Sequence, residues 1–250
     1  NNYGQIGDST TTSEFLPMDT GLSGYKQIAV GREHVVALGN DNKVYTWGKD
    51  TYGQLGNGAA GDSDVPVQVS VITNNVMSIA SGEYHSCAID NTNNLFCWGR
   101  NNFGQVGAGS MGTDFQSPQP VTLHAGVSNL LVDKVACGDN HTLAVNVQGK
   151  LCAWGNNANG QVGNSSTTNT AFPQVVDPIL TDSDTVVFGD MVGTFQIAAG
   201  GNFSMALKNS NKVYTWGSNV RGQLGRAAPT MVPSIVNGDY SYIGAGGETA

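Results

Sequence analysis

The chain has 250 residues, of which only 12% are charged and 34 are Gly, and its formal net charge is −8. It holds 11 Lys and Arg in total, and Lys49, Arg100, Arg221 and Arg226 are scattered along it. A nucleic-acid-binding surface needs clustered cations that release counterions, and no apolar run approaches the roughly 18 residues of a membrane-spanning helix. We therefore expect neither a nucleic-acid partner nor a membrane span in this segment.

One pattern of Trp, Gly and Gln recurs along the chain. It reads VYTWGKDTYGQLG at 44–56, LFCWGRNNFGQVG at 95–107, LCAWGNNANGQVG at 151–163 and VYTWGSNVRGQLG at 213–225. Its second half also occurs near the start, at Tyr3–Gly7, and successive tryptophans stand 51, 56 and 62 residues apart. Repeats of this length form arrays in which each unit buries its apolar face against a neighbour. The sequence therefore predicts a single domain.

The chain divides into four full units and two partial ones. We place their boundaries at 1–24 (partial), 25–75, 76–131, 132–193, 194–239 and 240–250 (partial). The first full unit contains the short apolar runs KQIAVG, HVVALG, VYTWG and PVQV, separated by turn residues such as Asn40–Asn42. Four β-type runs joined by Asn, Asp and Gly turns predict a four-stranded antiparallel sheet, and helical periodicity is absent. The predicted fold is an all-β propeller, or an arc of one.

The units differ in length at one place, between the GQ[LIV]G element and the next unit. The added residues fall at 57–74, 108–131 and 164–194. Insertions of this kind form loops, and loops on a rigid scaffold are where binding residues collect.

The two partial units almost complement each other. Aligned on the first full unit, the chain starts at the position of Asp50 and stops at that of Val35, so the hairpin equivalent to 36–49 is missing. A closed ring of five units would leave open strand edges, which favours part of a longer ring. The chain also begins without Met, which indicates that its true N-terminus lies elsewhere.

The pattern [IV]-A-x-G-x-x-H, a small-apolar strand and W-G-x-N-x-x-G-Q-[LV]-G resembles the repeat of the regulator of chromosome condensation (RCC1-like) family over nearly the whole chain. The resemblance implies a propeller of about seven four-stranded blades. Members of that family include an exchange factor for the GTPase Ran, a plant UV-B photoreceptor, ubiquitin ligases and a secreted bacterial inhibitor of β-lactamases. Fold alone therefore does not give function.

Two activities of that family are not expected here. The photoreceptor depends on Trp in a G-W-R-H-T pattern, and the matching positions read Gly31-Arg32-Glu33-His34, Gly82-Glu83-Tyr84-His85 and Gly138-Asp139-Asn140-His141. Chromatin binding uses basic extensions, whereas this chain is acidic. The run HSCA at 85–88 followed by FCWG at 96–99 resembles the repeat variant of secreted and cell-surface members.

The four cysteines predict at most one disulfide. If a hairpin pairs Ile89 with Leu95, Cys87 lies directly opposite Cys97, close to disulfide reach. The alternatives of a disulfide and of two buried thiols remain open. We expect Cys137 and Cys152, on the first and third strands of their unit, to be thiols, and no C-x-x-C zinc pattern is present.

Other candidate residues favour structural roles. His34, His85 and His141 share one repeat position, where a ring of imidazoles could bind a metal, but Phe203 and Thr249 interrupt it. We therefore expect each imidazole to bridge polar groups within or between blades, and the tryptophans to pack blades together. The acidic runs 62–64 and 182–184 are interpreted as solvated loops in preference to Ca²⁺ sites.

No catalytic motif is present, so we predict no enzyme activity, cofactor or metal. The N-glycosylation sequons are at Asn140, Asn164 and Asn202, with Asn164 in a long loop, although chance occurrence is an alternative because Asn, Ser and Thr are abundant.

We predict a non-catalytic protein-binding scaffold, or a structural subunit of an extracellular or cell-surface assembly. Its contact surface would be the insert loops, with Phe115 and Phe172 as apolar anchors. The alternative is an intracellular exchange-factor-like or ubiquitin-ligase-associated domain that engages a small GTPase. A third class is an accessory domain of an enzyme.

Overall fold

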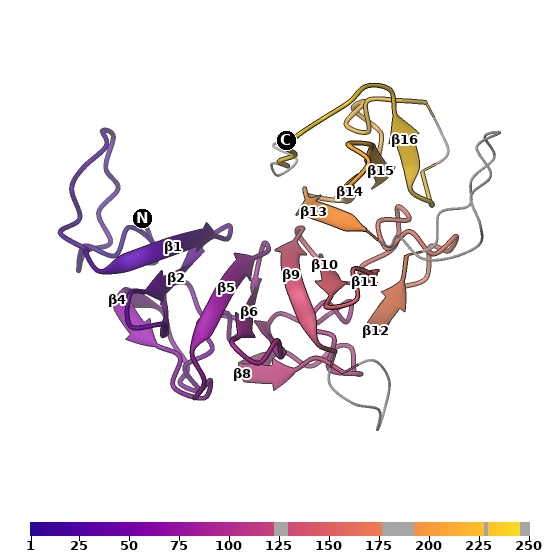
Figure 1. Ribbon diagram of the computed structural model, residues 1–250. Coiled ribbons are helices and arrows are strands. Elements are labelled where there is room, and N and C mark those ends of the chain that lie inside the picture. The colour runs from indigo at the N-terminus through magenta and orange to yellow at the C-terminus, as the bar shows by residue number, and fades with distance from the viewer. Residues whose placement is uncertain (123–129, 177–192, 228–229, 246–250) are drawn as a thin grey trace.

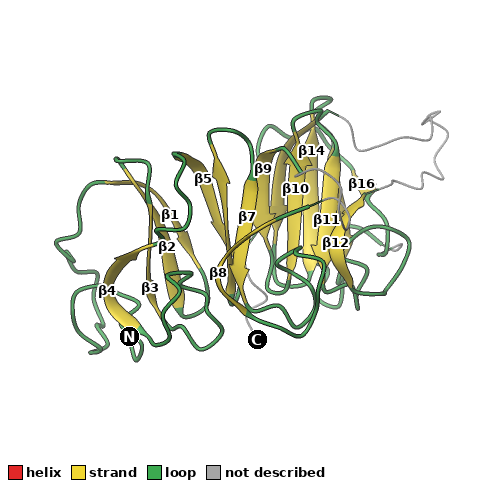
Figure 2. Cartoon of the chain, turned by 90° about the horizontal axis from the view of Figure 1, so that it is seen from below, coloured by secondary structure: helices red, strands yellow, loops and turns green. Residues whose placement is uncertain are grey.

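The computed structural model describes residues 1–122, 130–176, 193–227 and 230–245, and within these ranges every regular element is a β-strand (Figure 2). The first sheet contains β1 (Tyr25–Val30), β2 (His34–Gly39), β3 (Val44–Gly48) and β4 (Ser63–Gln68). The second contains β5 (Val76–Ser81), β6 (His85–Asp90), β7 (Leu95–Gly99) and β8 (Phe115–Pro120). The third contains β9 (Val132–Cys137), β10 (His141–Asn146), β11 (Leu151–Gly155) and β12 (Thr170–Val175). The fourth contains β13 (Thr194–Ala199), β14 (Phe203–Lys208), β15 (Val213–Gly217) and β16 (Ser234–Val236).

The four sheets are arranged as consecutive propeller blades. Strands pair antiparallel in chain order within each sheet, and the first strands β1, β5, β9 and β13 contact one another in sequence. Figure 1 shows the sheets fanning outward from these inner strands as an arc. Each sheet falls within one of the four predicted full units. The predicted all-β propeller architecture is confirmed.

The hairpin between β2 and β3 follows from its turn residues. Asn42 has a φ of 62°, and Asn93 and Asn211 occupy the same place in the second and fourth blades with φ of 64° and 61°. Asn tolerates this left-handed conformation better than most residues, since its short polar side chain bonds locally. The turn places HVVALG opposite VYTWG, with Val35 paired to Trp47.

The apolar core lies between neighbouring blades, and the tryptophans are its largest members. Trp98, Trp154 and Trp216 are fully buried. The indole Nε1 of Trp98 donates to the backbone carbonyl of Gln54 in the preceding blade at 2.9 Å. Gly56 turns beneath that indole with a φ of 66°, and a Cβ there would lie 2.4 Å from Nε1. The repeated Gln-x-Gly turn therefore binds the Trp of the next blade, because the Gln carbonyl accepts its indole N–H and the Gly leaves room for its ring.

A second element of each junction is a chain of buried hydrogen bonds, which we call the blade-junction relay. At the first junction, the hydroxyl of Ser86 donates to the Gln54 carbonyl at 3.0 Å, so its oxygen accepts from His34 Nε2 at 2.9 Å. The later junctions repeat this with His85, Thr142, Gln105 and Trp154, and with His141, Ser204, Gln161 and Trp216. Each imidazole thus bridges two blades, as the structural interpretation of the histidines predicts.

Removing one relay hydroxyl is expected to destabilise the fold. The change Thr142→Val keeps the side-chain shape but leaves the buried His85 N–H without its acceptor, which costs about 1–3 kcal/mol. Thr142→Ser keeps the hydroxyl used at the other two junctions, so it is expected to cost less than about 1 kcal/mol. Urea denaturation of the three proteins checks this, and equal stability of the Val variant would contradict a stabilising relay.

Candidate functional site

The structure joins Cys87 and Cys97 in a disulfide, the first of the two predicted alternatives. The register of β6 and β7 is the expected one, with Ile89 opposite Leu95 and Cys87 opposite Cys97. Both cysteines are buried in a cluster that also contains Trp154 of the next blade. The bond therefore ties the central hairpin of the second blade at its junction with the third.

Phe115 and Phe172 lie in strands and not in loops. Phe115 begins β8, pairs with Gly99 and packs against the core cluster of the second junction. Phe172 lies within β12, and its ring covers Gly109, where an added Cβ would come within 2.5 Å of it. Both residues are half-buried, so each contributes to packing between the outer parts of neighbouring blades. The insert segments 57–74, 108–131 and 164–194 each contain the fourth strand of their blade, β4, β8 and β12, so less of each segment is loop than expected.

The three sequon asparagines are half-buried, and their carboxamides take part in hydrogen bonds. Asn140 accepts from Gln105 Nε2 at 3.2 Å, and Asn202 accepts from Gln161 Nε2 at 3.3 Å. Asn164 accepts from Asn157 Nδ2 at 3.1 Å. Glycosylation at these positions stays a prediction.

The histidines and the acidic run at 62–64 have structural partners. Burial lowers the pKa of His34 and of His85 to about 3 and that of His141 to about 4, so all three imidazoles are neutral at pH 7. Asp62 accepts the Asp50 backbone N–H at 2.8 Å and closes the insert loop, as Asp114 does for Asn101 at 2.8 Å. The run 182–184 lies outside the described residues.

A group of cations and tyrosines lies on the first two blades and on the N-terminal segment that precedes them. We call it the cation–aromatic face, and it consists of Tyr3, Arg32, Lys49, Tyr52, Tyr84 and Arg100. At its centre, the rings of Tyr52 and Tyr84 meet edge to face with centroids 5.1 Å apart. The Arg100 guanidinium lies 4.8 Å from the Tyr52 centroid and 5.6 Å from that of Tyr84. A cation within about 6 Å of a ring is attracted by its electron-rich face.

Two further cations border the tyrosine pair. Lys49 Nζ lies 4.3 Å from the Tyr3 centroid and 6.0 Å from that of Tyr84, and it bonds Glu33 Oε2 at 2.8 Å. The hydrogen bond with Glu33 raises the pKa of Lys49, so the ammonium stays charged. Arg32 lies 6.0 Å from the Tyr84 centroid and pairs with Glu83, while its own side chain is 63% exposed. The face therefore offers fixed donors and ring edges to a partner.

The sequence-based view that the cations are scattered is wrong for Lys49 and Arg100. Each of them directly follows the Trp-Gly pair of its own repeat. Lys49 and Arg100 therefore occupy equivalent positions in adjacent blades. Tyr52 lies in the loop after Lys49, and Tyr84 in the turn between β5 and β6. An alignment of neighbouring repeats, position by position, is the sequence signal that could have located this face.

Apart from Tyr3 in the N-terminal segment, the residues of the cation–aromatic face lie on the first two blades. In the third and fourth blades, Asn156 and Ser218 take the place of Lys49 and Arg100, and Asn140 and Asn202 that of Tyr84. These blades fold into the same four-stranded sheets without the cations or tyrosines. The fold itself therefore does not require them.

Comparison with known proteins places the chain among RCC1-like domains. The family model described as an RCC1-like domain matches residues 1–250. The ultraviolet-B receptor UVR8 of Arabidopsis thaliana is 31% identical over 227 residues, which are 89% of this chain and 48% of the receptor. The E3 ubiquitin-protein ligase HERC2 of Homo sapiens is 31% identical over 242 residues, which are 93% of this chain and 5% of the ligase.

Among solved structures, human WBSCR16 has a TM-score of 0.80 and 25% sequence identity, covering 98% of this chain and 64% of that protein. The chain spans about half the length of UVR8 and a small part of HERC2. Within the described ranges, no helix has the length and apolar character needed to cross a membrane.

Proposed function

Because this chain belongs to the family of RCC1-like domains, we propose that it is a non-catalytic scaffold that binds a partner protein through its cation–aromatic face. The observation that carries this proposal is the restriction of Tyr52, Tyr84 and Arg100 to two of four otherwise equivalent blades. Because the third and fourth blades form the same sheets without them, these residues are not needed for the fold and are available for binding. Tyr and Arg are also the side chains that most often dominate binding energy in protein interfaces.

The chemistry of the face suits a polar protein surface that carries carboxylates. Lys49 and Arg32 are each paired with a glutamate, whereas Arg100 lies over the rings of Tyr52 and Tyr84 and donates to the side-chain oxygen of Asn102. An Arg held over aromatic rings presents its N–H donors in a fixed fork, which matches a carboxylate in two places. The tyrosines add rigid contact area with little loss of side-chain entropy.

We favour this face over Phe115 and Phe172 as the main contact. Both phenylalanines pack against their own chain and are half-buried, so a partner gains little additional apolar area from them. The insert-loop surface is kept as the second surface to be tested.

The proposal is tested by first capturing the partner protein and then measuring its affinity for variants of the cation–aromatic face. A photo-reactive benzophenone residue at position 32 captures the partner from the source organism, and the partner is then purified. The double change Lys49→Glu and Arg100→Glu is expected to weaken its binding about 100-fold or more, since two central contacts are reversed in charge. Arg221→Glu, on the fourth blade, is the matched control and is expected to change the affinity by less than about twofold.

Two outcomes contradict the proposed face. One is an unchanged affinity in the double charge variant when its thermal midpoint equals that of the wild type. The other is a loss of affinity seen only when Phe115→Ala and Phe172→Ala are combined in a folded protein, which assigns the contact to the insert loops.

For the setting of this scaffold, we propose an extracellular or cell-surface assembly. The Cys87–Cys97 disulfide supports this, since structural disulfides persist mainly in oxidising compartments. Intact-mass measurement of the natural protein with and without reductant, together with glycan release, tests it. A mass gain of about 2 Da on reduction, or a glycan at Asn164, is expected.

The second candidate is an intracellular domain that engages a small GTPase or works beside a ubiquitin ligase. It is favoured by the 31% identity to HERC2, which is described as an E3 ubiquitin-protein ligase. Reduced thiols at Cys87 and Cys97 in the natural protein, together with capture of a GTPase by the residue at position 32, support this candidate over the first.

A further inference from the structure

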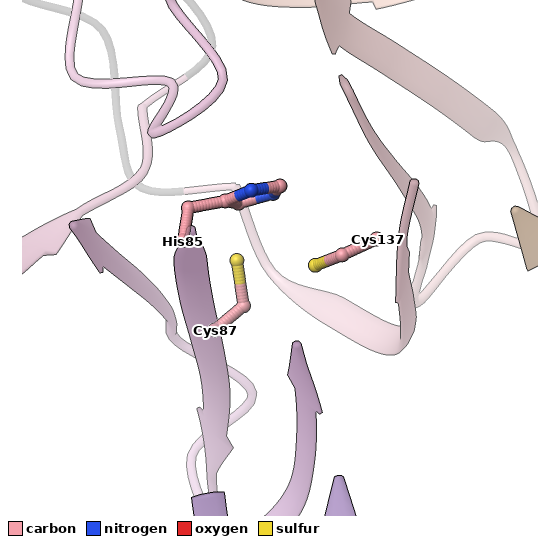
Figure 3. Close-up of side chains that lie close together, drawn as sticks. All are labelled: His85, Cys87 and Cys137. Carbon is pink, nitrogen blue, oxygen red and sulfur yellow. The ribbon is translucent and has the colours of Figure 1, made fainter. Parts of the chain in front are cut away.

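A thiol lies beside the disulfide at the junction between β6 and β9. The sulfurs of Cys87 and Cys137 and a ring nitrogen of His85 all lie within 4.8 Å of one another. Figure 3 shows the sulfurs of Cys87 and Cys137 pointing into the same space beside the His85 ring. Cys87 is bonded to Cys97 in its own blade, whereas Cys137, on the first strand of the next blade, carries a thiol.

The same thiol borders a cavity at the inner end of the blades. The cavity has a volume of about 710 Å³, and Gly31, Gly82, Gly138 and Gly200 from the four blades line it. Cys137 is half-buried and lines the cavity, while Cys87 and Cys97 are fully buried. Of the three cysteines Cys87, Cys97 and Cys137, it is therefore Cys137 that borders the cavity.

We propose that Cys137 is an alternative partner of Cys87 and exchanges with Cys97 in an internal thiol–disulfide reaction. The Cys137 thiol loses its proton, and its sulfur attacks Cys87 Sγ and forms the Cys87–Cys137 bond. The Cys87–Cys97 bond breaks, and Cys97 leaves as a thiolate that takes up a proton. The numbers of thiols and disulfides stay the same, so no external oxidant or reductant is consumed.

The exchange changes what the crosslink holds together. The Cys87–Cys97 bond joins β6 to β7 within the second blade, while a Cys87–Cys137 bond joins β6 to β9 across the blade junction. The first loop spans 10 residues, and the second spans the 50 residues from Cys87 to Cys137. A closed loop of that length restricts the unfolded chain more strongly. The product is a propeller arc whose second and third blades are covalently linked.

Burial sets the rate of this reaction. It raises the pKa of the Cys137 thiol to about 12, against a smaller opposing effect of the Thr142 hydroxyl, so little thiolate exists at neutral pH. His85 on β6 is neutral and offers no positive charge to the thiolate. The other charged groups at the cavity wall are Arg32, Glu83 and Asp139. Exchange is therefore slow near neutrality and becomes faster with rising pH.

The variant Cys97→Ser tests the pairing directly. Treated with oxidised glutathione, it is expected to form a Cys87–Cys137 disulfide, detected by peptide mapping without reductant. The same bond is expected when Cys152→Ser is added, and no internal bond when Cys137→Ser is added. Folded Cys97→Ser protein in which Cys87 and Cys137 both stay alkylatable, or in which Cys87 pairs with Cys152, overturns the proposal.

The wild-type protein gives a test that needs no variant. Oxidised protein is incubated at several pH values, quenched with acid and alkylated. The alkyl group, which marks the free thiol, is expected on Cys137 at the start and increasingly on Cys97 as exchange proceeds. The rate of this change is expected to rise about tenfold per pH unit. A label that stays on Cys137 at every pH, including alkaline pH at which the fold is intact, overturns the proposal.

Discussion

Trp154→Ala is expected to lower the free energy of unfolding by about 4–5 kcal/mol, because truncating a fully buried Trp leaves a large cavity. The indole packs between the second and third blades, in the cluster that holds the Cys87–Cys97 disulfide. Its Nε1 also donates to the Gln105 carbonyl at 2.9 Å, and that bond is lost as well. Urea denaturation measures the change.

Two further variants show whether the loss of stability in Trp154→Ala comes from lost packing at this junction or from a general failure to fold. Trp47→Ala is expected to cost roughly half as much, since Trp47 belongs to a much smaller cluster and is 4% exposed. Trp154→Phe keeps an aromatic ring in the site, so it is expected to fold even where Trp154→Ala does not. A loss below about 2 kcal/mol for Trp154→Ala contradicts the assignment of the core to the blade junctions.

Acidification from pH 7 to pH 5 is expected to remove roughly 4–5 kcal/mol of stability. The folded-state pKa values of His34 and His85 are lowered to about 3 and that of His141 to about 4, below the unfolded value of 6.5. Below pH 6.5 the unfolded chain therefore binds protons that the folded chain does not. Each histidine lowers the stability by about 1.4 kcal/mol per pH unit until its folded pKa is reached.

Asp50 opposes part of this loss. Burial raises its folded pKa to about 6 from 3.8, so the folded chain takes up this proton first as the pH falls through 6. That uptake stabilises the folded state by about 1.4 kcal/mol per pH unit between pH 6 and 3.8. The net proton uptake on unfolding is therefore expected to be about two near pH 5, where three histidines titrate against one carboxyl group.

The slope of unfolding free energy against pH measures this uptake. His141→Gln retains a donor for Ser204 but does not titrate, so it is expected to reduce the uptake by about one proton. Asp41 and Asp90 have lowered pKa values and titrate below this window. Equal stability at pH 7 and pH 5 contradicts the burial of neutral imidazoles.

The sequence was sufficient for the architecture because most structural residues recur at the same positions in the four full units. Trp98 and its counterparts and the Gln-x-Gly turns recur in all four full units, and the Asn turn recurs in three of them. The position of Cys87 opposite Cys97 followed from hairpin register, whereas register alone did not decide between a disulfide and two thiols. These are local relations, which strand periodicity determines.

The candidate site was harder to predict, because it depends on contacts between units. Arg32, Lys49 and Arg100 are far apart in the chain and meet through the lateral packing of two blades. The proximity of Cys137 to Cys87 has the same origin, since the first strand of one blade packs on the second strand of its neighbour. Phe115 and Phe172 were assigned to loops because the start of the fourth strand has no alternating pattern.

The blade-junction relay has a direction, and that direction bears on how such chains arise. At each of the three described junctions, the earlier unit presents an imidazole and a Gln carbonyl, and the later unit presents a hydroxyl and an indole. Any copy with this head-to-tail polarity fits behind any other. Gene duplication, or recombination between unequal copies, can therefore add or delete a whole unit and still form a complete blade junction. The number of units can then change during evolution while the contacts between neighbouring units stay the same.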